Sequence, residues 1–241
     1  VELKSRLELG EVDLTEVVTE GAVFESCSFR GVRFNVSEHR SSAFVSCTFT
    51  RCAFFDSTWT GCKLVGSVFE DCSFDLLKVD GGDWSFVTLR GATLSSASFA
   101  DVRMREADLS GVRAQGGSLR GLDLSGAQMQ GANLEGADRR GCNLQGCDLR
   151  GARMAGANLT KADLRQAMLG ALPLGAGRAT SSSLKGARLR YANARLADLS
   201  GAILDEADLR GADLTGAMMT GASLRGADIG TVIGLDFSKA A

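Results

Sequence analysis

A five-residue period constrains this chain more than any other feature. From Leu122 to Gln166 it reads LDLSG, AQMQG, ANLEG, ADRRG, CNLQG, CDLRG, ARMAG, ANLTK and ADLRQ. Most groups have a small residue, a polar residue, Leu or Met, a second polar residue and then Gly. If the Leu, Phe or Met is called the centre, the centres fall at numbers ending in 4 or 9, from Leu9 to Ile229. The small inward residue then falls at numbers ending in 2 or 7.

A period of five fits neither the 3.6-residue turn of a helix nor the alternation of a strand. It fits a coil that turns a corner every five residues, with the centre and the small residue pointing inward. Four sides give a square coil of about 20 residues, and coils stack ~4.8 Å apart. The sequence therefore predicts an all-β quadrilateral β-helix of about twelve coils, forming a rod ~55 to 60 Å long.

The cysteines support this register. All seven have numbers ending in 2 or 7, the inward position: 27, 47, 52, 62, 72, 142 and 147. We interpret them as small core residues. A metal or redox site is the alternative, because Cys52 and Cys72 would stack one coil apart, but no CxxC motif is present.

Several residues depart from the pattern. His39 occupies an inward centre, where we expect a satisfied or locally displaced core histidine. Arg139 also occupies a centre, and the cost of burying its charge predicts a local bulge. The segment 170–183 contains the sole proline and predicts a loosened coil or surface loop. A kink or bulge is expected within 75–86.

Composition indicates one domain over 1–241, with no linker or second domain. We expect an irregular N-terminal coil over 1–20 and a cap or dimer contact over 230–241. No apolar run is long enough for a membrane helix and no signal peptide is recognisable, so a cytoplasmic protein is expected. We find no catalytic, metal-binding or cofactor-binding motif, so binding through the outer faces is predicted instead of enzymatic activity.

The runs ADLSG, ANLEG, CDLRG and ADLTG resemble the pentapeptide-repeat family, whose members form right-handed quadrilateral β-helices. Within that family, SEHRSSAF at 37–44, CTF at 47–49, GSVFEDCSF at 66–74 and the following LLKVDGGDWSFVTLRG resemble the MfpA and Qnr fluoroquinolone-resistance proteins. That resemblance implies binding to DNA gyrase by imitation of duplex DNA, with inhibition of the enzyme or its protection from quinolone-like poisons. The alternative is a structural or scaffold solenoid with no topoisomerase role.

Charge and exposed apolar residues locate the candidate contact. Residues 1–100 hold 14 acids and 9 bases, and 101–241 hold 15 acids and 18 bases. If each outward residue is assigned to one of the four sides by assuming that every coil has 20 residues, one side is the most acidic. It carries Asp13, Glu16, Asp56, Asp75, Glu135, Asp213 and Asp236 against Arg33, Arg113, Arg153 and Arg195. The candidate partner-binding residues lie in the N-terminal half: Phe55, Asp56, Glu70, Asp71, Asp75, Leu76, Asp80, Asp83 and Phe86.

The C-terminal end is apolar and fits the repeat poorly. A β-helix end exposes unpaired backbone and core, so Val232, Ile233, Leu235 and Phe237 are expected to cap it or to form a homodimer contact. Direct nucleic-acid binding is disfavoured, because the arginines of the basic half are dispersed among aspartates and form no stripe with interleaved aromatic residues.

Overall fold

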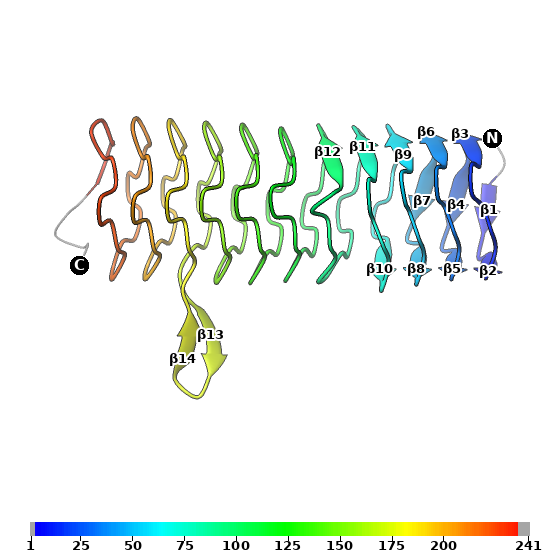
Figure 1. Cartoon of the computed structure of the whole chain (residues 1–241), viewed down its shortest axis with the longest axis horizontal. Coiled ribbons are helices and arrows are strands. Elements are labelled where there is room, and N and C mark those ends of the chain that lie inside the picture. Colours follow the sequence, from blue (N-terminus) through cyan, green and yellow to red (C-terminus); the bar gives the residue numbers. More distant parts are fainter. Residues whose placement is uncertain (1–2, 236–241) are drawn as a thin grey trace.

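The computed structural model describes residues 3–235. They form an all-β, right-handed quadrilateral β-helix, as the sequence predicts (Figure 1). No α-helix occurs among these residues. The coils stack along one axis with the two termini at opposite ends, and a single hairpin projects from the side (Figure 1).

Three of the four faces begin as parallel ladders of short strands. The first face contains β1 (Leu3–Ser5), β4 (Val23–Glu25) and β7 (Ala43–Val45). The second contains β2 (Glu8–Gly10), β5 (Ser28–Arg30), β8 (Thr48–Thr50) and β10 (Val68–Glu70). The fourth contains β3 (Val18–Glu20), β6 (Glu38–Arg40), β9 (Thr58–Thr60), β11 (Lys78–Asp80) and β12 (Ser98–Ala100). The third face is joined by single bridges such as Asp13 to Arg33.

The pairing register confirms the 20-residue coil. Leu3 pairs with Val23, Val23 with Ala43, and further bridges continue the column to Ile233. This column contains twelve residues: Leu3, Val23, Ala43, Lys63, Asp83, Arg103, Asp123, Asn143, Asp163, Asn193, Asp213 and Ile233. At ~4.8 Å per coil, the eleven steps between them give a rod ~53 Å long.

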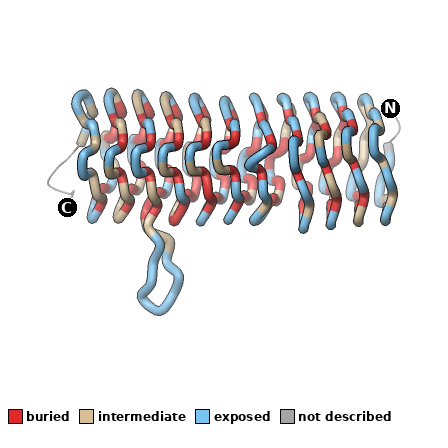
Figure 2. Tube along the Cα trace, in the orientation of Figure 1, coloured by how far each residue is buried: buried red, intermediate tan, exposed pale blue. Residues whose placement is uncertain are grey.

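Inward residues form one continuous core along the axis (Figure 2). In the N-terminal coils the aromatic centres stack directly on one another, with ring centroids 4.7 Å apart for Phe24 and Phe44 and 4.9 Å for Phe29 and Phe49. Leu and Met centres take over after Phe99. Six of the seven cysteines are buried and Cys72 is half-buried, all as free thiols, which confirms their role as core residues.

Most corner residues, whose numbers end in 1 or 6, adopt positive φ angles along the rod. Glycine fills most corners after Gly111, where this left-handed backbone carries little strain. Bulky residues fill several others, including Leu76 at φ 59°, Phe86 at φ 61° and Tyr191 at φ 57°. The sequence did not predict this backbone strain, because the period identifies a corner but not its φ angle.

The segment 170–183 contains a protruding hairpin of β13 (Leu172–Gly175) and β14 (Arg178–Thr180), which pair antiparallel. Its tip is exposed (Figure 2), so the predicted surface loop is confirmed. The bridge from Met168 to Asp198 spans 30 residues instead of 20, so the hairpin adds ten. Ten residues equal two sides, which preserves the five-residue register but moves every later residue to the opposite face.

The face assignment that assumes 20 residues in every coil is therefore wrong beyond the hairpin. Asp213 pairs with Asn193, which pairs with Asp163 on the first face, so Asp213 and the neighbouring Arg195 do not lie on the third face. After this correction, the second face is the most acidic. It carries Glu8, Glu11, Glu70, Asp71, Asp108, Asp148 and Asp198 against Arg30, Arg51, Arg90 and Arg150.

The predicted bulge at Arg139 is wrong. Its backbone N–H donates to the Asn158 carbonyl at 2.9 Å, as in a regular coil, and its side chain has 0% exposure. The bulge is unnecessary because the preceding coil has small inward residues, Ala114 and Gly117, which leave room along the axis.

His39 is a satisfied core residue with 1% exposure. Its Nδ1 lies 2.7 Å from the Thr19 hydroxyl and its Nε2 lies 3.0 Å from the Ser37 hydroxyl. Trp59 packs beside the ring, with centroids 4.2 Å apart.

The first coil is more regular than predicted, because β1, β2 and β3 pair in register with the next coil. Its inward Leu7 and Leu9 are only partly buried.

Candidate protein-interaction surface

Carboxylates in the two halves of the rod differ in how they are paired. Among the described residues after Ala100, ten carboxylates lie within 4.0 Å of an arginine or lysine nitrogen. They are Asp108, Asp123, Glu135, Asp138, Asp148, Asp163, Glu206, Asp208, Asp213 and Asp228. In the described part of the N-terminal half, only Glu11, Asp13, Glu38, Asp56 and Asp83 are paired in this way. Unpaired negative charge is therefore concentrated at the N-terminal half.

Four of the unpaired carboxylates follow one another around half of one coil. Glu70 lies on the second face, Asp71 at the next corner, Asp75 on the third face and Asp80 on the fourth. We call this group the acidic half-ring. Asp75 accepts a hydrogen bond from the Ser96 hydroxyl at 3.1 Å, which does not neutralise its charge. The half-ring projects negative charge over three faces of the rod.

An exposed apolar edge crosses the half-ring between the third and fourth faces. Val36, Phe55 and Leu76 are 44%, 48% and 46% exposed and lie in consecutive coils. The Val36 N–H donates to the Phe55 carbonyl at 2.7 Å, so these two residues are adjacent, and the Asp56 N–H donates to the Asp75 carbonyl at 2.9 Å, which brings the next coil beside Phe55. Val36 and Leu76 occupy left-handed corners, a costly conformation for bulky residues. Phe55 and Leu76, two of the candidate partner-binding residues, are thus both exposed at this edge, and Val36 extends it.

The backbone ladder opens beside the half-ring. In the preceding coil, the Phe54 N–H donates to the Ser73 carbonyl and the Asp56 N–H to the Asp75 carbonyl. One coil later, four successive bonds of this ladder are missing from the described backbone. They would join Asp71 to Arg90, Thr93 to Cys72, Phe74 to Thr93 and Leu76 to Ser95. We call the space between 71–76 and 90–96 the slot. It overlaps the segment 75–86, where a kink or bulge is expected, only at residues 75–76. The ladder bonds are present again at Lys78, Gly81 and Trp84, so the disturbance lies mostly outside the expected segment.

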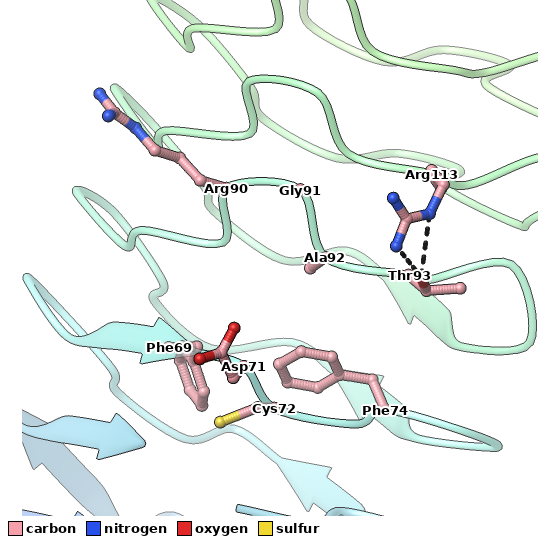
Figure 3. Close-up of a pocket in the computed structure, with 9 residues that line it drawn as sticks. All are labelled: Phe69, Asp71, Cys72, Phe74, Arg90, Gly91, Ala92, Thr93 and Arg113. Atoms are coloured by element: carbon pink, nitrogen blue, oxygen red, sulfur yellow. Dashed lines mark hydrogen bonds between the residues drawn. The ribbon is translucent and has the colours of Figure 1, made fainter. Parts of the chain in front are cut away.

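The slot is a cavity of about 350 Å³ between the two coils (Figure 3). Phe69, Phe74 and the half-buried Cys72 line one side, and Arg90, Gly91, Ala92 and Thr93 line the other. Arg113, from the next coil, also lines it and donates to the Thr93 hydroxyl at 2.8 Å (Figure 3). The slot lies where the aromatic centres Phe69 and Phe74 meet the aliphatic centres Leu89 and Leu94, so two coils of different cross-section adjoin.

The sequence identified most of the carboxylates but did not place them correctly relative to one another. Asp83 and Phe86 lie on the first face and its corner, away from the half-ring. Asp83 also pairs with Arg103 at 3.8 Å. Although burial raises its pKa, hydrogen bonds from the Ser85 hydroxyl and N–H lower it further, and the net shift is downward. Asp56 pairs with Lys78 at 2.8 Å. Asp83 therefore has a structural role, because it accepts the hydrogen bonds of the turn that follows it on the first face.

Sequence reasoning missed Val36, Thr93 and Arg113 in this region. The only signal for the slot was the change from aromatic to aliphatic centres, which indicated different cross-sections but did not predict which face would open. Thr93 and Arg113 lie on the third face and match the repeat in every respect. Only the missing backbone bonds distinguish their surroundings.

At the C-terminal end, Val232 and Leu235 are partly buried against the core. Ile233 is 57% exposed and pairs with Asp213 through the last bridge of its column. Phe237, the fourth predicted contact residue, lies outside the described residues. The described end of the rod thus combines partial capping by two residues with an exposed apolar side chain.

No helix in the described part of the chain has the length and apolar character required to cross a bilayer. No group of three or more His, Cys, Asp or Glu side chains within residues 3–235 is arranged to hold a metal ion.

Comparison with known proteins gives similarities of limited extent. Over 82 residues the chain is 42% identical to the pentapeptide repeat protein MfpA of Mycobacterium tuberculosis, which covers 34% of this chain and 45% of that protein. Over 45 residues it is 47% identical to MfpA of Mycolicibacterium smegmatis, covering 19% and 24% of the two chains. The matched region thus spans less than half of either relative.

Among solved structures, HetL, a pentapeptide repeat protein of heterocyst regulation from the cyanobacterium Nostoc, is 25% identical, with 95% of this chain and 89% of that chain covered and a TM-score of 0.39. A structure of QnrB1, described as a plasmid-mediated fluoroquinolone resistance protein, is 15% identical, with coverage of 94% and 91% and a TM-score of 0.39.

The family profile of pentapeptide repeats matches eight copies, at residues 79–111, 103–138, 140–170, 182–221 and 195–229. The gap from 171 to 181 coincides with the hairpin of β13 and β14. These matches cover more than half of the sequence, and the square coil of 20 residues is the architecture that the repeats specify. The chain belongs to the pentapeptide-repeat family.

Proposed function

We propose that this chain binds DNA gyrase by imitating duplex DNA, and that it inhibits the enzyme or protects it from quinolone-like poisons. The observation that carries the proposal is the concentration of unpaired carboxylates and exposed apolar residues at the N-terminal half of the rod. The similarity to MfpA supports the choice of partner.

Local charge matters more here than net charge. Duplex DNA carries one negative charge per ~1.7 Å, whereas this chain has a net charge of only −2. Ion pairs already neutralise most carboxylates of the C-terminal half within the rod. We infer that the acidic half-ring approaches basic side chains of the enzyme, while Val36, Phe55 and Leu76 supply apolar contact at its edge.

Charge reversal tests this placement. The variant E70K/D71K changes two unpaired carboxylates of the half-ring. E20K/E25K is the matched control, because Glu20 and Glu25 are also exposed and belong to no described ion pair, and the change in net charge is identical. We expect E70K/D71K to lose its effect in a gyrase supercoiling assay, with and without a fluoroquinolone, while E20K/E25K retains it.

Three other outcomes have different meanings. Equal losses in both variants would reject the half-ring as the contact. No effect of the unmodified protein on gyrase would reject the proposed function and favour the scaffold alternative. A DNA gel shift by the protein would favour direct nucleic-acid binding instead.

We also infer a two-fold contact through the C-terminal end, because Ile233 is exposed beside the partly buried Val232 and Leu235. Light scattering at micromolar concentration should show a dimer for the unmodified chain and a monomer for I233E. A monomer in both cases would reject the contact.

A further inference from the structure

The slot has two facing edges of backbone groups that lack hydrogen-bond partners within the described residues. On the edge formed by 71–76, the Phe74 N–H and the Cys72 carbonyl have none. On the edge formed by 90–96, neither the N–H nor the carbonyl of Thr93 has one. Phe74 is 3% exposed and Cys72 is half-buried, so these polar groups are costly to leave unpaired.

The preceding coil shows the pattern that is missing here. The Ser73 N–H donates to the Cys52 carbonyl, and the Phe54 N–H donates to the Ser73 carbonyl, both at 3.0 Å. One residue thus bonds to two residues of the coil before it. In the slot, Thr93 should do the same with Cys72 and Phe74, and it does not.

The slot is open on one face only. At one end the Phe69 N–H donates to the Thr88 carbonyl at 3.0 Å, and beyond the other end the Ser98 N–H donates to the Leu77 carbonyl at 2.8 Å. These bonds hold the two coils together on both sides of the opening. The cavity of about 350 Å³ lies within the range of ligand pockets, and its length limits an occupant to about one side of a coil.

We propose that the slot binds a short extended peptide, which pairs in parallel with both coils and completes the ladder. Its central residue donates to the Cys72 carbonyl and accepts from the Phe74 N–H. The residues on either side accept from the Thr93 N–H and donate to the Thr93 carbonyl. A peptide carries donors and acceptors towards both of its edges, whereas an anion would leave the two carbonyls unpaired.

The columns of the rod set the side chains of this peptide. The residue before the central one follows the inward column of Cys72 and Ala92, which holds small side chains. The residue after it follows the column of Phe74 and Leu94, which is apolar. The central residue points to solvent, as Thr93 does. The preferred sequence is therefore a small residue, any residue and an apolar residue, and this binding does not require the proposed contact with gyrase.

Amide hydrogen exchange with a defined probe tests the proposal. The probe is acetyl-Gly-Ala-Thr-Leu-Ser-amide, a copy of residues 91–95, used at millimolar concentration. At ten times its dissociation constant, exchange at Phe74 and Thr93 should slow about elevenfold. Exchange at Phe54 and Ser73, which are already paired, should not change. No slowing at Phe74 and Thr93 would mean that the slot holds only water and would overturn the proposal.

Two N-methylated probes form a matched pair. Methylation of the threonine nitrogen removes the donor to the Cys72 carbonyl and should abolish protection. Methylation of the alanine nitrogen should leave protection intact, because the equivalent N–H of Ala92 donates within its own turn, to the Leu89 carbonyl, and not to the ladder. Equal protection by both methylated probes would overturn the proposal.

A variant that fills the slot gives a second test. A92F places a large side chain in the cavity and should abolish protection by the unmethylated probe. S73V is the control and should retain protection, because Ser73 is exposed and its backbone bonds to the preceding coil remain. Full protection in A92F would place the peptide elsewhere and overturn the proposal. If A92F does not fold, the methylated pair still decides the question.

Discussion

His39 should make the rod sensitive to mild acid. Burial lowers its pKa from 6.5 to about 4, because a charged imidazolium would lose its hydration between Phe34, Phe44 and Trp59. Between these two values the unfolded chain binds a proton that the folded chain excludes. Stability is therefore complete above pH 6.5 and is lost as the pH falls towards 4.

The size of the effect follows from the shift. A difference of about 2.5 pKa units corresponds to about 3 kcal/mol of unfolding free energy at 1.36 kcal/mol per unit. The side chain is 1% exposed, so solvent screening does not reduce this figure appreciably. A loss of this size is a substantial part of the 5–15 kcal/mol typical of a folded domain.

Urea unfolding at a series of pH values from 7.5 to about 4 measures this loss. H39F is the comparison, because an aromatic ring suits this column of centres next to Trp59 and does not titrate. Carboxylates contribute equally to both proteins, so the difference between their slopes belongs to His39. The unmodified chain should lose about 3 kcal/mol more than H39F; parallel curves would refute a neutral buried His39.

Three further predictions concern the hairpin, the slot and the cysteines. Deleting residues 171–180 joins Gly170 to Ser181 and restores the 20-residue coil. Circular dichroism should show the same fold, and the free energy of unfolding should change by no more than about 2 kcal/mol, the closure cost of a ten-residue loop. Loss of the fold would contradict the register. Amide hydrogen exchange should be fast at Phe74 and Thr93 and slow at their equivalents one coil earlier, Phe54 and Ser73, which donate to the ladder at 3.0 Å; equal protection would mean that the slot is closed in solution. A thiol reagent should modify Cys72 first and leave the six buried cysteines unreacted in the native protein, as checked by mass spectrometry with C72S as control; rapid modification of several cysteines would contradict their burial.

The fold was predictable because the period acts at every position. The inward placement of Cys47 or Leu144 depends only on the count of five, and the structure buries both completely. The composition of 170–183 departs from the repeat and predicts a loop there. It does not predict that the ten-residue hairpin moves every later residue to the opposite face of the rod. Its residues keep the count, and only the 30-residue bridge from Met168 to Asp198 reveals the rotation.

The candidate surface was less predictable, because it depends on pairing. The sequence could not show that Asp56 has Lys78 as a partner while Asp71 has no ion-pair partner among the described residues. Nor could it place Asp83 apart from Asp75, since that requires the position of each side. Arg139 failed as a prediction for a related reason: the cost of burying a charge is clear from sequence, but the room beside Ala114 is a property of packing.

Bulky residues at left-handed corners can indicate where this rod makes contacts with a partner. Leu76, Phe86 and Leu196 hold left-handed φ angles of 59°, 61° and 58° while their side chains remain exposed. A left-handed conformation costs an ordinary residue roughly 1–2 kcal/mol, so random drift at a corner favours glycine. If a bulky residue is retained at the same corner in related chains, the contact of its side chain should contribute more free energy than the left-handed conformation costs. Comparing corner residues across related chains could therefore map their binding surfaces without a structure of any complex.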